Sequence, residues 1–134
     1  MSYPNPYPVT LAGRNSFRFS AVANASYFQR VTMSFSGGDD DAGVVFNGRG
    51  EGVAMTTADG KTSYLIPQVT TQVTCTLLFQ YSTDGTKFVN ANVVSVSNSG
   101  TSPDPQTLTI GTEDAQDGDN NDTLLTLVTT QIEG

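Results

Sequence analysis

Apolar side chains recur at every second position over much of this chain, and this period constrains its fold more than any other feature. The clearest example is the segment 73–81, where apolar and polar residues alternate except at Leu78. A period of two places alternate side chains on opposite faces of a strand, so one face of this segment is buried. No part of the sequence has the period typical of an amphipathic helix. The pattern predicts an all-β protein.

Turn-forming residues divide the chain into short strands. Asp84-Gly85 predicts a hairpin between residues 73–81 and 88–96, and Asp59-Gly60 predicts a second hairpin. Short strands at this spacing indicate an antiparallel sandwich or barrel, and we expect a β-sandwich of about nine strands in one domain, residues 1–134. The other expected strands are 17–23 and 31–35, paired through the connection 24–30, and 43–46, 52–56 and 62–66.

Charge and composition exclude several classes of function. The formal net charge of −7 argues against binding to nucleic acid or to an anionic membrane surface. Cys75, the only cysteine, cannot form an internal disulfide and lies in an alternating apolar run, so we expect a buried, inert thiol. The first eight residues lack the basic and apolar regions of a secretory leader, and no segment is long enough for membrane insertion. We expect synthesis as a cytoplasmic product that reaches any external site by a non-classical route.

Five carboxylates and three carboxamides that could bind a metal lie between Glu113 and Asp122. So many like charges repel one another unless a cation lies among them, and oxygen ligands in this number favour calcium over magnesium. An EF-hand loop does not fit, because Asp122 stands where that loop needs glycine and Val128 where it needs glutamate. The flanking residues also have the pattern of strands. The other reading of the run is an ordinary solvated acidic loop.

The acidic run and the apolar strand after it resemble the two-calcium fucose/mannose lectins of bacteria. Residues 17–26, which include an asparagine after an alternating strand, resemble an early strand of the same family, and residues 9–11 resemble its first strand. The resemblance implies that one calcium is held by Glu113, Asp117, Asp119 and Asp122. It implies that the second is held by Asn24, Asp119, Asn121 and Asp122, together with the terminal carboxylate of Gly134 from a neighbouring subunit.

The resemblance also implies the sugar-binding residues. Asp114 would accept a hydrogen bond from a sugar hydroxyl, and Ala25 and Ser26 would contact the sugar where specificity is set. The calcium ligands Asn24, Glu113, Asp117, Asp119, Asp122 and Gly134 would surround the same sugar. In the lectin family that this sequence resembles, alanine at the position of Ala25 accompanies a preference for mannose. The implied protein is a non-enzymatic lectin for mannose- or fucose-containing glycans, with two calcium ions per subunit, and a homodimer or higher homo-oligomer.

Two positions depart from the family pattern. The segment from Asp122 to Gly134 is two residues longer than the usual ending, which moves the terminus of an extended strand by ~6–7 Å. Tyr27 stands where the family has a small residue. Its ring would stack on a sugar or narrow the pocket, or it is a half-buried strand aromatic.

A non-catalytic structural β-domain, whose acidic loop binds calcium without binding sugar, is the main alternative. It would share the acidic run but would not require Asn24 or Gly134. Glycoside hydrolysis fits less well, because a cation would keep the clustered carboxylates ionised and leave no general acid.

Overall fold

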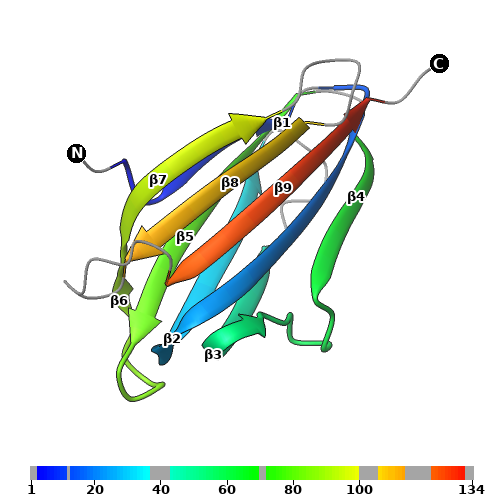
Figure 1. Cartoon of the computed structure of the whole chain (residues 1–134). Coiled ribbons are helices and arrows are strands. Elements are labelled where there is room, and N and C mark those ends of the chain that lie inside the picture. The colour runs from blue at the N-terminus through cyan, green and yellow to red at the C-terminus, as the bar shows by residue number, and fades with distance from the viewer. Residues whose placement is uncertain are drawn as a thin grey trace.

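The computed structural model describes residues 3–11, 13–36, 43–69, 72–99, 106–113 and 122–131. These residues form nine antiparallel strands and no helix, as the sequence predicted. The strands curl into the nearly closed, sandwich-like fold of Figure 1. They are β1 (Tyr7–Leu11), β2 (Asn15–Ser36), β3 (Val44–Ala54), β4 (Ser63–Val69), β5 (Val73–Ser82), β6 (Val89–Asn90), β7 (Asn92–Ser99), β8 (Gln106–Glu113) and β9 (Thr123–Gln131).

The long strand β2 belongs to both layers of the fold. Its first half pairs with β9 from Asn15 to Ala23, and its second half pairs on the same side with β5 from Phe28 to Ser36. On the other side it pairs first with β4 and then with β3. The layers β7-β8-β9 and β1-β5 therefore separate where β2 passes from one partner to the other, at residues 24–27.

The continuity of β2 corrects one prediction from the sequence. Segments 17–23 and 31–35 were expected to be separate strands paired with each other through residues 24–30. Instead they are the two halves of one strand, and each pairs with different neighbours. The connecting residues stay extended because β3 pairs alongside them, with register shifts between Ala23 and Asn24 and between Ala25 and Gln29.

Both predicted turns exist, but the hairpins are incomplete. After the Asp84-Gly85 turn, only Val89 and Asn90 pair with β5, and the chain then joins β8 as β7. At Asp59-Gly60, the amide of Thr57 donates to the carbonyl of Lys61 at 2.9 Å. The strands on either side of this turn, β3 and β4, pair in succession with β2.

The N-terminal segment closes the sheet where β5 and β7 diverge. Tyr3 forms a backbone bridge to Val93 of β7. The carboxamide of Asn5 donates to the carbonyls of Phe79 and Ala91, both at 2.8 Å, and accepts from the amide of Phe79 at 3.0 Å. This side chain thus supplies to β5 and Ala91 the hydrogen bonds that a neighbouring strand would otherwise supply.

Side chains from both layers fill a single core. The inward positions of β5 are Cys75, Leu77 and Phe79, all fully buried, which confirms the alternation seen in the sequence. Burial raises the pKa of the Cys75 thiol to about 12, so this cysteine is an inert core residue, as expected. The largest other buried apolar residues are Leu11, Phe19, Val31, Met33, Phe46, Met55, Val93, Ile110 and Leu125.

The described part of the chain contains no helix that is long and apolar enough to cross a membrane.

Candidate functional site

The structure brings together three of the residues that the sequence analysis assigned to the metal site. Asn24 lies in β2 where the layers separate, Glu113 ends β8, and Asp122 immediately precedes β9. The amide of Asn24 donates to the carbonyl of Asp122 at 2.9 Å, and the amide of Asp122 donates to the carbonyl of Thr112 at 2.8 Å. Backbone hydrogen bonds therefore fix Asp122 between β2 and the end of β8. Figure 1 shows that the end of β8 and the start of β9 lie close together, at the lower left of the view.

An irregularity in β3 holds the side chain of Asn24. Asn24 pairs with Glu51 while Ala23 pairs with Val53, so Gly52 is the extra residue of a bulge. Gly52 has a φ of +68°, which favours glycine, and its amide donates to Oδ1 of Asn24 at 2.8 Å. This bond orients the carboxamide oxygen of Asn24 at the bulge.

The donor atoms fit a hard cation. Asp122 is only 1% exposed, and burying a carboxylate is unfavourable unless positive charge or hydrogen bonds compensate it. Beside it, the hydroxyl of Thr112 is buried without a hydrogen-bond partner within the described part of the chain. Oxygen donors of this kind, with Glu113 at the end of the neighbouring strand, are the ligand type that calcium prefers.

The structure leaves the other assigned residues untested. Within the described residues, no three histidine, cysteine, aspartate or glutamate side chains form a metal-binding group. The backbone of Ala25 and Ser26 lies in β2, next to Asn24. The remaining assigned residues lie outside the described residues, and their roles stay predictions: Asp114, Asp117, Asp119, Asn121 and Gly134.

A buried polar bridge beside the site was not predicted from the sequence. The hydroxyl of Thr123 donates to Oε1 of Gln29 at 2.8 Å, and Nε2 of Gln29 donates to the carbonyl of Tyr27 at 3.3 Å. Gln29 and Thr123 are each 1% exposed. The bridge links β2 to β9 just after the point where the layers separate. Gln29 falls at an apolar-face position of a strand, and no local pattern reveals that its partner is 94 residues away.

The turn after β5 packs against the same region of β2. A methyl group placed on Gly85 would lie 3.1 Å from the ring of Phe28, so only glycine fits closely there. Asp84 holds the turn, because its carboxylate accepts from the amides of Lys87 and Thr86 and from the hydroxyl of Ser82. These bonds, chiefly that from Lys87, lower the pKa of Asp84 well below its ordinary value.

The lowered pKa of Asp84 predicts a specific dependence of stability on pH. A carboxylate with a depressed folded-state pKa stabilises the fold fully above its unfolded pKa, near 3.8, and loses this contribution as the pH falls through the folded value. We expect Asp84→Asn to lower the melting temperature in a calcium-free buffer, and the gap from the wild type to narrow below about pH 4. Thermal unfolding between pH 7 and pH 2 measures this. A gap that stays constant over the range would contradict the prediction.

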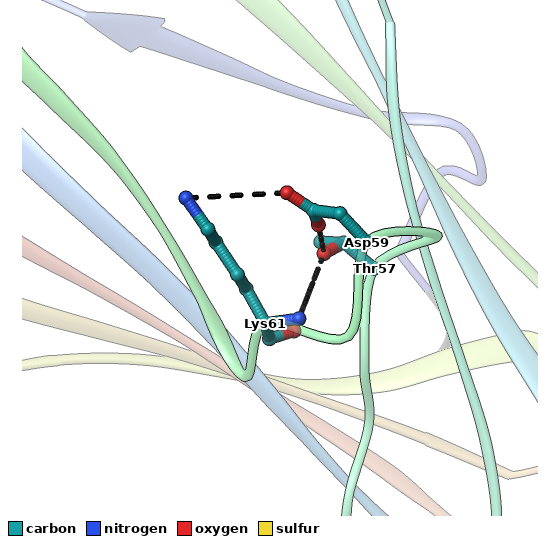
Figure 2. A network of polar contacts seen from close by, with 3 residues as sticks. All are labelled: Thr57, Asp59 and Lys61. Carbon is teal, nitrogen blue, oxygen red and sulfur yellow. Dashed lines mark hydrogen bonds and ion pairs between the residues drawn. The ribbon is translucent and has the colours of Figure 1, made fainter.

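An open cleft of about 430 Å³ lies between the start of β3 and the turn before β4. Figure 2 shows three of its lining residues, where the hydroxyl of Thr57 donates to Asp59 and Lys61 lies 3.9 Å from the same carboxylate. The bond from Thr57 is the main cause of a lowered pKa at Asp59. These side chains bind one another at the surface, and none of the described residues that line the cleft is assigned to the site.

With this geometry established, the family of the chain can be stated. The model of the family described as "Fucose-binding lectin II (PA-IIL)" matches residues 9–131. The chain belongs to this lectin family. Membership covers β1 to β9 and confirms the resemblance found at both ends of the sequence. The fucose-binding lectin II proteins are non-catalytic, so the prediction that the chain is not an enzyme is also confirmed.

Solved structures of bacterial lectins share the fold. A high-affinity mannose-binding lectin of Ralstonia solanacearum aligns with a TM-score of 0.60 and 21% identity, over 90% of this chain and 93% of its own. The Chromobacterium violaceum lectin CV2L, solved with alpha-methyl-fucoside, gives 0.59 and 20%, over 94% and 96%. The C-terminal domain of the BC2L-C lectin from Burkholderia cenocepacia gives 0.58 and 18%, over 96% and 97%. No curated protein sequence matches the chain.

Proposed function

We propose that this lectin binds mannose- or fucose-type sugars through two calcium ions held where β2, β8 and β9 meet. The observation that carries the proposal is the hydrogen bond from the amide of Asn24 to the carbonyl of Asp122. It joins the two segments, far apart in the sequence, that the family resemblance assigns to one metal site. The bulge at Gly52 and the burial of Asp122 support the same assignment, because they orient oxygen donors at this junction.

Each ligand has a defined part in the proposed site. Glu113 and Asp122 belong to the first calcium shell, with Asp117 and Asp119. Asn24 and Asp122 belong to the second, with Asp119 and Asn121 and with Gly134 of a neighbouring subunit, which makes a homodimer the smallest complete assembly.

Bound calcium would supply coordination positions that sugar hydroxyls fill in place of water. The role of the protein is to orient the sugar and accept its protons. Carboxylates at the site, with Asp114 among them, would accept charge-assisted hydrogen bonds from the hydroxyls. Such bonds depend on the angle between adjacent hydroxyls, so they discriminate between sugars by stereochemistry. Ala25 and Ser26, next to Asn24, would contact the rest of the ring.

We propose mannose-type sugars as the preferred ligands, because Ala25 occupies the position where alanine accompanies mannose preference. The solved relatives include both a mannose-binding lectin and a lectin bound to a fucoside, so both sugars have to be tested.

Isothermal titration of the calcium-loaded protein with methyl α-mannoside and with methyl α-fucoside tests this function. We expect binding to both sugars, tighter for the mannoside, and complete loss of heat after addition of EDTA. Binding that persists in EDTA would contradict the calcium mechanism. Calcium binding without heat from either sugar would instead support the structural β-domain as the function.

A further inference from the structure

An aromatic surface lies on β2 close to the proposed calcium site, and the proposed function does not use it. The ring of Tyr27 is 36% exposed and stacks on the ring of Tyr81, with centroids 6.0 Å apart and planes inclined by 16°. Tyr81 pairs in register with Val89 of β6, whose side chain is 52% exposed and lies on the same face. We call Tyr27, Tyr81 and Val89 the aromatic shelf.

The shelf lies within the reach of a short glycan from the calcium site. Tyr27 follows Asn24 by three residues, so their Cα atoms are at most about 11 Å apart. This distance is comparable to the length of a disaccharide. A disaccharide whose first sugar is bound at the junction of β2 and β9 is therefore long enough to reach Tyr27.

A chain of contacts fixes the shelf relative to the calcium site. The carbonyl of Tyr27 accepts from Gln29, and Gln29 accepts from Thr123, the residue directly after Asp122. On the other side of Tyr27, the ring of Phe28 is covered by the guanidinium of Arg49 at 4.3 Å and packed against Gly85. The backbone of Tyr27 is thus held in place and its ring packs on Tyr81, so less conformational entropy remains to be lost when a ligand covers that ring.

Exposed aromatic rings of this kind match the apolar face of a pyranose. One side of a sugar ring presents C–H groups, and an aromatic face with a polar rim buries them while the hydroxyls stay hydrated. Among the large apolar side chains that the described residues expose, Tyr27 alone is stacked and lies within three residues of an assigned calcium ligand.

We propose that the aromatic shelf is a second sugar subsite, which takes the residue linked to the calcium-bound sugar. The ligand class is therefore a mannose- or fucose-terminated disaccharide or longer glycan, with an apolar ring face on the penultimate residue. This inference rests on the proposed calcium-dependent function.

The test compares a monosaccharide with disaccharides on matched variants. Methyl α-mannoside and the α1,2-, α1,3- and α1,6-linked mannobioses are titrated into calcium-loaded wild type, Tyr27→Ala and Tyr27→Phe. We expect at least one mannobiose to bind wild type about tenfold more tightly than the monosaccharide, which corresponds to about 1.4 kcal/mol. Tyr27→Ala should bring this ratio close to one, Tyr27→Phe should keep it, and monosaccharide affinity should stay the same in all three.

Tyr3→Ala is the matched control, because Tyr3 is equally exposed, at 41%, and belongs to the N-terminal segment that bridges to β7. It should leave the ratio unchanged. A wild-type ratio near one for all three mannobioses, or the same ratio in Tyr27→Ala, would overturn the subsite while monosaccharide binding upheld the proposed function. If neither the mannosides nor methyl α-fucoside bound, both the subsite and the proposed function would be overturned.

Discussion

Asp122→Asn is expected to lower calcium affinity by about 100-fold or more and to remove sugar binding at ordinary calcium concentrations. The carboxamide has nearly the same size, so the backbone bonds to Asn24 and Thr112 can remain. What is lost is one negative charge at a site assigned to both ions. Calcium titration followed by titration with methyl α-mannoside measures the two effects.

Asp122→Asn is expected to weaken calcium binding without lowering the stability of the calcium-free protein. In EDTA the variant should be at least as stable as wild type, because a buried charge without its cation has been removed. Calcium should raise the melting temperature of wild type by mass action, and much less that of the variant. Asp59→Asn is the control, since Asp59 is exposed on the separate turn before β4. Unchanged calcium affinity in Asp122→Asn would remove Asp122 from the metal site.

Asn5→Ala is expected to lower the free energy of unfolding by about 2–4 kcal/mol, because three hydrogen bonds to backbone groups are lost together. The affected groups are the amide and carbonyl of Phe79 and the carbonyl of Ala91. Phe79 itself is fully buried, so water replaces these bonds poorly. Urea denaturation of calcium-loaded protein measures the change.

Asn98→Ala serves as the control for Asn5→Ala, because Asn98 is an exposed asparagine in β7. It should change stability by less than about 0.5 kcal/mol. The Asn5 variant should also keep its calcium affinity, since the hydrogen bonds of the Asn5 side chain go to Phe79 of β5 and to Ala91. A loss of stability no larger than that of the control would show that the N-terminal segment does not close the sheet energetically.

The alternation of residues was enough to predict the strand class, because burial on one face leaves a period of two in each strand. It could not predict which strands pair. Residues 24–30 were interpreted as a connection, and they begin with Asn24-Ala25-Ser26, which has little strand preference. Pairing with β3 overrides that local preference and makes β2 continuous.

For the candidate site too, local sequence predicted the type of residue but not the contacts between residues far apart in sequence. The run of carboxylates from Glu113 to Asp122 reveals its chemistry by composition alone. The contacts that hold the described residues around the site come from positions distant in sequence: Gly52 donates to Asn24, and Gln29 accepts from Thr123. No local pattern carries these contacts, so they could be found only in the folded structure.

The pairing of β2 with β9 also determines when this protein becomes functional during its synthesis. Asn15 pairs with Gln131 and Ala23 with Thr123. The first half of β2 therefore cannot pair with β9 until β9 has left the ribosome. Pairings over such a separation in sequence are slow to form. A nascent chain therefore exposes an unpaired edge of β2 until β9 has been synthesised.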